Sequence, residues 1–407
     1  MVDTVNRFRS LLVHRALIVF MLGHFTVDMF GGLMPVLYAL MATEFNLDNQ
    51  AVGLIALAYT ASSSLSQPLF GYLADRFGSR YFAVASMMWS ATFVGLAGLA
   101  PSYGMLVILA MLAGLGSGAY HPQGASNAAA VSGDLRKNTA MSVYTVGGTA
   151  GYALGPLLGA LIFGLLGTGG SLAVAPFGFA IAFLMLHQLR QLGLGLAQHH
   201  ASARTQQGAG AIQWRPLVPV MAVVMLRSWV TLSVVTFIPL WFKDQGYSSL
   251  FFSALAALVL GFGALGTIVG GILADRLGQR IVLWASLVAA IPFLILFAAF
   301  PGPWSLLLGP LFGFCIEMGL SVTLVVAQRL LPGRVGVASG FILGIGFVTG
   351  GIGAPITGAI ADSVGTGLAL GSLAILIVAA ALVVTRIPRA ILHHPRMLPA
   401  PIPEPAT

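Results

Sequence analysis

The chain has 407 residues, of which only 7% are Asp, Glu, Lys or Arg and 58% belong to the hydrophobic set AVILMFWYC. Soluble domains carry about 25% charged residues, so this composition excludes a soluble enzyme, a nucleic-acid-binding protein and a disordered scaffold, and predicts an integral membrane protein. The net charge of +8 does not indicate nucleic acid, because the basic residues lie in short segments between apolar runs.

Apolar runs long enough to span a bilayer, which takes about 20 residues, follow one another along the chain. The first has a basic N-terminal flank without a small-residue cleavage site, so we interpret it as an uncleaved helix rather than a signal peptide. The first half of the chain predicts helices over 14–42, 51–73, 81–100, 104–131, 139–165 and 172–192. The second half predicts helices over 216–242, 250–273, 281–300, 303–330, 336–361 and 367–386. We expect an all-α integral membrane fold of twelve transmembrane helices in two six-helix bundles, because continuous runs are not typical of a β-barrel.

A stretch rich in Gln, His, Ala and Gly separates the two sets of helices and has the composition of a linker. The predicted domains are an N-terminal bundle (1–190), a linker (191–215), a C-terminal bundle (216–386) and a tail (387–407). All but two of the 19 lysines and arginines lie in the termini, the linker or the loops on that same side of the helices. We therefore expect both termini in the cytoplasm of a cell with a bacterial-type inner membrane. The two exceptions are Arg227, inside a helix, and Lys243, on the opposite side.

A ten-residue segment occurs twice, 200 residues apart. Residues 71–80 read GYLADRFGSR and residues 271–280 read GILADRLGQR, with seven identical positions. Two halves in parallel repeat are typical of transporters that rock around a central site. We assign a cytoplasmic gating role to the charges of both copies: Asp75, Arg76, Arg80, Asp275, Arg276 and Arg280. The alternative is that these charges only set the topology.

The fifth predicted helix contains small residues four positions apart, which allow two helices to approach closely. We assign helix packing to Gly151, Gly155, Pro156 and Gly159, and the Gly-Pro pair can also bend the helix.

Five ionisable residues lie well inside predicted helices, where a charge costs roughly 2.5–3.5 kcal/mol on insertion scales. They are His24 and Asp28 of the first helix, His121 of the fourth, Arg227 of the seventh and Glu317 of the tenth. Burial eases protonation of a carboxylate near neutral pH, so Asp28 and Glu317 are candidate proton carriers, with His24 and His121 as relays. A structural pair between Asp28 and Arg227 is the alternative.

The guanidinium fork of Arg227 suits a carboxylate or phosphonate group, so we place it in a substrate site. Further candidates are polar or aromatic residues that could equally serve packing: Tyr120, Gln123, Asn127, Tyr144, Trp229 and Gln67. The single cysteine, Cys315, excludes an intramolecular disulfide and a Cys-based metal site. We expect no metal and no cofactor.

The repeated segment resembles motif A of the major facilitator superfamily. The run Gly151-x-x-x-Gly155-Pro156-x-x-Gly159 resembles motif C, which is typical of antiporters in that superfamily. The resemblance implies a central cavity lined by the first, fourth, seventh and tenth helices, which are the helices that carry the five ionisable residues.

A narrower resemblance, to the fosmidomycin resistance protein family of efflux transporters, extends over both halves and rests on residues 23–29, 62–68, 116–122, 146–148 and 327–336. It implies proton-driven export of a small drug-like molecule, and the anionic namesake substrate fits Arg227. The chain departs from the family at Gln123, where a glutamate is usual, and at Glu317, where a small or apolar residue is usual. We hypothesise that the proton-carrying carboxylate has moved to the tenth helix.

The sequence thus predicts a monomeric antiporter whose partners are a small-molecule substrate, protons and the lipid bilayer, with no nucleic acid. A metabolite symporter or uniporter and a lipid or lysolipid flippase remain alternatives on the same fold. A receptor or an intramembrane enzyme is a further alternative, although no HExxH or GxSxG motif indicates catalysis.

Overall fold

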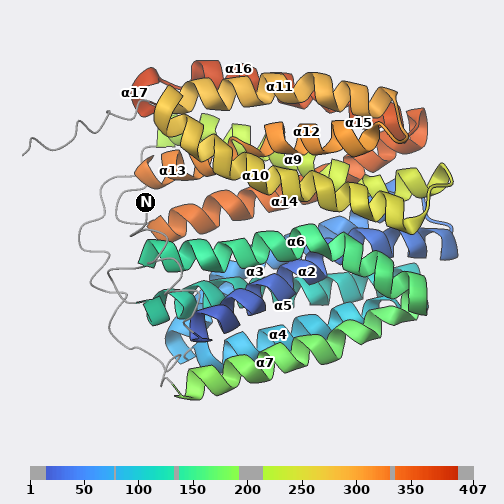
Figure 1. Cartoon of the computed structure of the whole chain (residues 1–407), viewed down its shortest axis with the longest axis vertical. Helices are drawn as coiled ribbons and strands as arrows, with labels where there is room; N and C mark the ends of the chain where they lie inside the picture. The colour runs from blue at the N-terminus through green and yellow to red at the C-terminus, as the bar shows by residue number, and fades with distance from the viewer. Residues whose placement is uncertain (1–14, 78, 133–136, 192–213, 331–334, 393–407) are drawn as a thin grey trace, which may run out of the picture.

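The computed structural model describes residues 15–77, 79–132, 137–191, 214–330 and 335–392. Within these ranges all regular secondary structure is helical, and the helices run side by side between two faces of the molecule (Figure 1). We call the face where α2 begins and α7 ends the terminal face. The opposite face, which carries the α2–α3 and α9–α10 connections, is the distal face.

The first half contains six membrane-crossing segments. They are α2 (Arg15–Glu44), α3 (Asn49–Phe77), α4 (Ser79–Ala97), α5 (Tyr103–Ser132), α6 (Lys137–Leu166) and α7 (Val174–Gln191), the last preceded by the 3-10 helix η2 (Thr168–Ala173).

The second half repeats this arrangement with two interrupted helices. Its segments are α9 (Trp214–Asp244), α10 (Ser249–Leu277), α11 (Gln279–Ala299), α12 (Ser305–Glu317) with α13 (Leu320–Leu330), α14 (Val335–Val364), and α15 (Thr366–Ser372) with α16 (Ala374–Arg386); the short α17 (Arg389–Leu392) follows. The predicted span 303–330 is therefore broken directly after Glu317.

The prediction of an all-α fold with twelve spans in two bundles is confirmed. In the described part of the chain, ten segments are long and apolar enough to cross a bilayer, and α3 and α4 are not among them. The middle of α3 is less apolar because it carries Ser62, Ser63, Ser64, Ser66 and Gln67. Helix α3 packs mainly against two other helices, α5 and α14.

Glycines bring the first and fifth helices of the N-terminal half into backbone contact. A Cβ atom at Gly151 would collide with the carbonyl oxygen of Phe25 in α2, and one at Gly155 would lie 2.7 Å from the Cα of Gly32. Gly159 lies over Leu33 of the same helix, and Pro156 is buried within an uninterrupted α6. The small residues of α6 therefore form its contact surface with α2.

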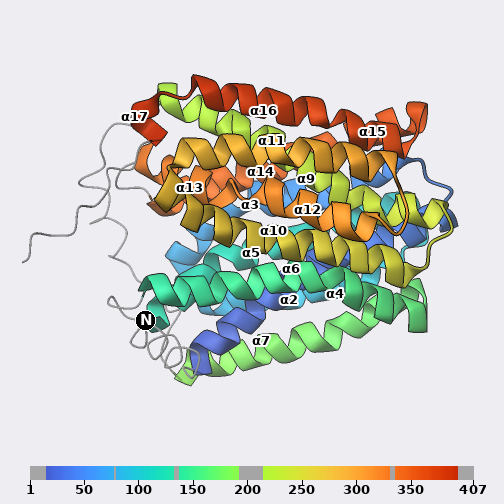
Figure 2. The same cartoon turned by 45° about the horizontal axis from the view of Figure 1, so that its top comes forward.

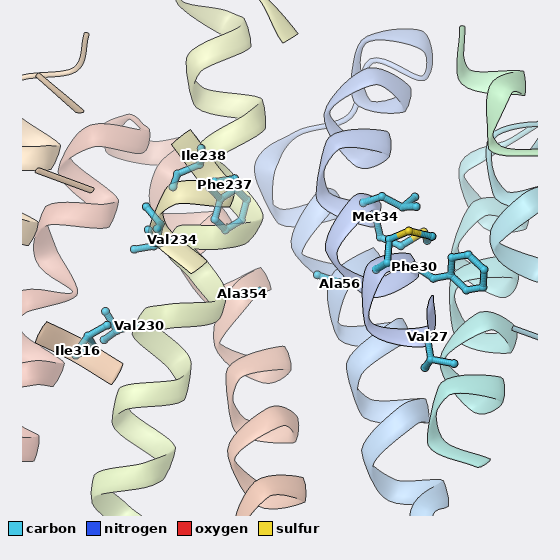
Figure 3. Close-up of a cluster of buried hydrophobic side chains, with 14 of the residues drawn as sticks. Val27, Phe30, Met34, Ala56, Val230, Val234, Phe237, Ile238, Ile316 and Ala354 are labelled. Carbon is cyan, nitrogen blue, oxygen red and sulfur yellow. The ribbon is translucent and has the colours of Figure 1, made fainter. Parts of the chain in front are cut away.

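The two halves meet along pairs of helices, chiefly α3 with α14 and α6 with α10, and with a smaller contact between α2 and α9. Figure 2 shows α10 beside α6 at this boundary. One cluster of buried apolar side chains extends through both halves, with Val27, Phe30 and Met34 of α2 on one side and Val230, Val234 and Phe237 of α9 on the other (Figure 3). Large apolar side chains such as Leu65, Leu165 and Ile375 are exposed on the outside, where a bilayer would cover them.

Candidate functional site

The first charged cluster lies between α2 and α5 and consists of His24, Asp28 and His121. His24 and Asp28 are four residues apart and so share one face of α2. The Nε2 atom of His24 lies 3.2 Å from Oδ2 of Asp28, and Nε2 of His121 lies 3.1 Å from Oδ1. The structure thus brings together three of the four predicted proton-coupling residues, and we call them the His-Asp-His triad.

Both histidine rings contact a main-chain carbonyl group through their Nδ1 atoms. The Nδ1 atom of His24 lies 2.9 Å from the carbonyl oxygen of Tyr144 in α6, and Nδ1 of His121 lies 2.7 Å from that of Ser117, one turn earlier in α5. The ring of Tyr144 also stacks on His24, with centroids 4.2 Å apart. These contacts fix both rings so that their Nε2 atoms point at the same carboxylate.

Space for the triad depends on a glycine of α6. A Cβ atom at Gly148 would lie 2.5 Å from both Oδ2 of Asp28 and Nε2 of His24, a distance that requires one group to move. The triad therefore needs a residue without a side chain at this position of the neighbouring helix.

The triad is partly exposed although it lies in the middle of long helices. The exposed fraction of the side chain is 22% for Asp28, 28% for His121 and 11% for His24. One ligand atom from each of the three residues also lies within 4.8 Å of the others, which is close enough for one cation. The three residues therefore form a compact, partly exposed group of ionisable side chains.

The second charged cluster lies in the C-terminal half between α9 and α12. Nη1 of Arg227 donates to Oε2 of Glu317 at 2.5 Å, and the hydroxyl of Thr231 donates to Oε1 at 2.9 Å. The side chains of Arg227 and Glu317 are 5% and 16% exposed. Among the described residues no acceptor contacts Nε of Arg227, and this atom is itself buried.

Arg227 therefore pairs with Glu317, and Asp28 pairs with the two histidines. The Asp28–Arg227 pair that the sequence left open is replaced by one charged contact within each half. The physical reason is proximity: each charge meets its partner between the first and fourth helices of its own bundle.

The break between α12 and α13 lies next to this second cluster. Because the helix stops at Glu317, its carbonyl group has no partner in the helix and accepts a hydrogen bond from the hydroxyl of Thr267 at 3.1 Å. Ser321 in turn donates to the carbonyl of Thr267 at 3.1 Å. The neighbouring helix α10 thus stabilises the break that positions Glu317.

The remaining predicted substrate residues occupy different environments. Tyr120 is fully buried and donates to the carbonyl of Phe20, while Gln123 is buried and donates to the carbonyl of Phe70. Asn127 is buried, and Gln67 is partly exposed on α3. Trp229 donates to Thr357 of α14 at 3.0 Å. Tyr144 touches the triad through its ring and its carbonyl group, and the ring of Tyr120 lies edge-to-face with that of His121, with centroids 6.3 Å apart.

Two of the predicted gating arginines, Arg80 and Arg280, bind within their own halves. Arg80 donates to the carbonyl of Leu189 at the end of α7, and Arg280 donates to the carbonyls of Thr385 and Ile387 at the end of α16. The two copies of the repeat thus make equivalent contacts with helix C-termini, where a cation is favourable. Arg276 is exposed. The side chains of Asp75, Arg76 and Asp275 lie outside the described residues.

At the distal face, two charged groups of the C-terminal half bind helix ends of the N-terminal half. Asp362 accepts hydrogen bonds from the main-chain N–H groups of Asn49 and Gln50 at 2.8 and 2.9 Å, at the start of α3. Lys243 donates to the carbonyl of Ala39 at 2.6 Å and to the hydroxyl of Thr43, at the end of α2. Each charge has the sign that its helix end favours. We call these two contacts the distal latch.

The sequence interpretation did not include the latch among the functional residues. One signal was present, since Lys243 is the single basic residue on its side of the predicted helices. For Asp362 no signal exists, because an acidic residue at the end of an apolar span is common and its partners are main-chain groups.

The comparison with known families decides the class of the protein. A model described as "Major Facilitator Superfamily" matches residues 17–342. The chain belongs to the major facilitator superfamily. As a superfamily member it is a multi-pass membrane transporter.

The relatives include the fosmidomycin resistance protein of Escherichia coli (strain K12), with 32% identity over 84% of this chain and 85% of that protein. An uncharacterized transporter of the superfamily from Bacillus subtilis (strain 168) is also 32% identical, over 87% and 88% of the two chains. A multidrug resistance protein of Enterobacter lignolyticus (strain SCF1) is 26% identical over 76% of both. The predicted resemblance to the fosmidomycin resistance family is thus confirmed.

Solved structures agree on the fold. A bacterial homologue of the human lysosomal transporter Spinster, inward-facing and occupied, superimposes with a TM-score of 0.80 at 15% identity and covers 95% of this chain and 99% of its own. The nucleoside transporter NupG gives a TM-score of 0.71 at 14% identity, with 92% and 100% coverage.

Proposed function

We propose that this transporter exports a small drug-like or anionic organic molecule in exchange for protons. The observation that carries the proposal is the placement of one charged cluster among the helices of each half. The His-Asp-His triad of the N-terminal half binds protons, and the guanidinium group of Arg227 in the C-terminal half, when it exchanges its contact with Glu317, binds an acidic group of the substrate. Relatives named for fosmidomycin resistance and multidrug resistance support export of drugs as the direction.

Alternating access in this proposal uses the distal latch. With both termini in the cytoplasm, the distal face is the outer face, and the latch closes it. In this proposal the substrate binds between the two halves, where it contacts Arg227 on one side and senses the protonation state of Asp28 on the other.

The test is transport by the purified protein in liposomes, with a panel that begins with fosmidomycin and includes anionic and cationic compounds. An antiporter accumulates substrate when the lumen is more acidic than the outside, because protons leave as substrate enters. A symporter does so when the outside is more acidic, and a uniporter ignores the pH difference. We expect antiport that is lost in Asp28→Asn. Accumulation with the opposite gradient, or indifference to it, would refute the proposal.

A second measurement needs no membrane. Because antiport requires protons and substrate to occupy the protein in turn, adding substrate to the unbuffered protein in detergent should release protons. Proton uptake on substrate addition would indicate symport instead.

A further inference from the structure

The three side chains of the His-Asp-His triad offer a set of atoms that fits one metal ion. One ligand atom from each of His24, Asp28 and His121 lies within 4.8 Å of the other two. The distances from Nε2 of the two histidines to the carboxylate oxygens of Asp28 are 3.2 and 3.1 Å. Ligand atoms that lie about 2.0–2.1 Å from a tetrahedral zinc ion are about 3.3 Å from one another. Small shifts of these side chains would therefore bring all three to coordination distance from a single ion.

The main-chain contacts of the two histidines leave their Nε2 atoms ready to bind a metal. The Nδ1 atom of His24 contacts the carbonyl oxygen of Tyr144 at 2.9 Å, and that of His121 contacts the carbonyl oxygen of Ser117 at 2.7 Å. Because a carbonyl oxygen only accepts, Nδ1 is the donor, and a neutral ring then presents the lone pair of Nε2 to Asp28. Histidines that bind metals almost always donate their other N–H group to a carbonyl, a carboxylate or water, which fixes the orientation of the ring. Both histidines of the triad already have this supporting hydrogen bond.

The triad also leaves room for a further ligand. The side chains of Asp28 and His121 are 22% and 28% exposed. On the neighbouring helix α6, a Cβ atom at Gly148 would lie 2.5 Å from both Oδ2 of Asp28 and Nε2 of His24, so no side chain at this position covers the two atoms. Zinc sites with three protein ligands leave their fourth position to water or to a bound molecule, and the partial exposure of the triad is what such a site requires.

The donor atoms indicate which metals would bind. Two imidazole nitrogens and one carboxylate oxygen suit zinc and similar transition metals, whereas magnesium and calcium prefer sets of oxygen ligands. Among the described residues, this is the one group of three His, Cys, Asp or Glu side chains whose ligand atoms lie this close together. No metal was expected from the sequence, since Asp28 and His121 are 93 positions apart and no local spacing joins them.

We infer that the triad binds one divalent transition-metal ion of the zinc type through Nε2 of His24, Nε2 of His121 and the carboxylate of Asp28. Binding of the metal does not depend on the proposed proton exchange. A second consequence does rest on the proposed function: an ion at the triad occupies the atoms that would bind protons, so Zn²⁺ inhibits antiport.

Titration of the purified full-length protein with ZnCl₂ in detergent tests the site. The protein carries no histidine tag, and calorimetry measures both the affinity and the number of ions. We expect one ion per chain, and an affinity at least about 100-fold weaker in His24→Gln and in His121→Gln, because loss of a supporting group alone commonly costs 10- to 100-fold. MgCl₂ should not bind to the triad.

The matched control replaces the histidine pairs of the predicted linker and tail by glutamine, and should bind zinc as the natural protein does. These residues are His199, His200, His393 and His394. Thermal midpoints without metal show whether each variant is folded.

A second measurement uses the natural protein alone. X-ray absorption of the protein loaded with one Zn²⁺ should show two imidazole nitrogens at about 2.0 Å together with oxygen ligands, and no sulfur. Absence of zinc binding, equal affinity in the two histidine variants, or a spectrum without imidazole nitrogens would overturn the metal site and leave the proposed proton exchange untouched.

Transport in liposomes separates the metal site from the proposed function. Zinc binding that depends on the triad, in a protein whose transport ignores the pH difference, would support the metal site and refute the proposed function. Zinc that binds to the triad but leaves proton-coupled transport unchanged would overturn the inhibition.

Discussion

Asp362 lies against the first turn of α3 so that one of its carboxylate oxygens accepts from both the main-chain N–H and the side-chain amide of Asn49, at 2.8 and 2.7 Å. The two residues belong to opposite halves and are 313 positions apart. A helix cap, which in most proteins is local, here joins the two bundles. This part of the stabilisation of the start of α3 is thus present only while the distal face is closed.

Asp362→Asn should therefore favour opening of the distal face. Loss of an N-terminal cap costs about 1 kcal/mol, which corresponds to about a fivefold change in the closed-to-open ratio. Distances between spin labels at Glu44→Cys and Ser363→Cys, in a Cys315→Ser background, would report the two populations. Asp48→Asn is the matched control, because Asp48 accepts from Ala51 at the same helix end but from within the same half. Equal shifts in both variants would argue against a latch.

Gly148→Ala should disable the triad without unfolding the protein. The added Cβ displaces Asp28 or His24, and displacements of about 1 Å in a functional site commonly cost tenfold or more. We expect proton-coupled transport to fall by at least about tenfold while the thermal midpoint is nearly unchanged. Gly164→Ala in the same helix is the control, since a Cβ there meets nothing within 4 Å. Normal transport by Gly148→Ala would show that the close packing around the triad is not required.

Glu317→Gln separates two roles of this carboxylate. The Glu317 carboxylate is the partner of a buried arginine. Loss of its negative charge should destabilise the protein by on the order of 3 kcal/mol, because Arg227 remains as an uncompensated charge. The double variant Arg227→Met with Glu317→Met should recover most of the thermal midpoint but not transport. If Glu317→Gln instead retained its stability and lost only the pH dependence of transport, Glu317 would be a proton carrier, as the sequence suggested. Normal transport with unchanged pH dependence would exclude that role.

Thr267→Val should weaken the break in the tenth membrane segment. The valine has nearly the same shape but cannot donate to the carbonyl of Glu317, and an unsatisfied buried carbonyl costs about 1–3 kcal/mol. We expect a lower unfolding midpoint in detergent. Thr349→Val is the control, because Thr349 bonds only to Ile345 within its own helix. Similar midpoints for the two variants would mean that α10 does not stabilise the break.

The spans and their arrangement were predictable because bilayer thickness and hydropathy fix the length and number of helices. The placement of Asp28, His24, His121, Arg227 and Glu317 on equivalent helices was also visible, since charges inside apolar runs stand out. The pairing of these five charged residues was not predictable from the sequence. The sequence left open a contact between Asp28 and Arg227, whereas the fold pairs each charge within its own half.

Features that depend on main-chain groups could not be predicted from the sequence, and the reason is common to all of them. The carbonyls of Tyr144 and Ser117, the helix ends that bind Asp362 and Lys243, and the break after Glu317 involve groups that every residue possesses. Side-chain identity therefore cannot mark them. Only the crossing of particular helices selects which of these groups meet a charge.

One crossing between α3 and α14 has a mechanical consequence. A Cβ atom at Gly53 would lie 2.5 Å from the Cα of Pro355, so these helices touch backbone to backbone near their distal ends. From Gly53 to Phe77, at the terminal face, α3 extends about 36 Å at 1.5 Å per residue. A rotation of only about 10° around this contact would move the far end by about 6 Å over that length. The contact between Gly53 and Pro355 acts as a pivot that lies close to the latch and far from the terminal face. A small displacement at the latch is therefore amplified at the terminal face, where it is large enough to open a path for a small molecule.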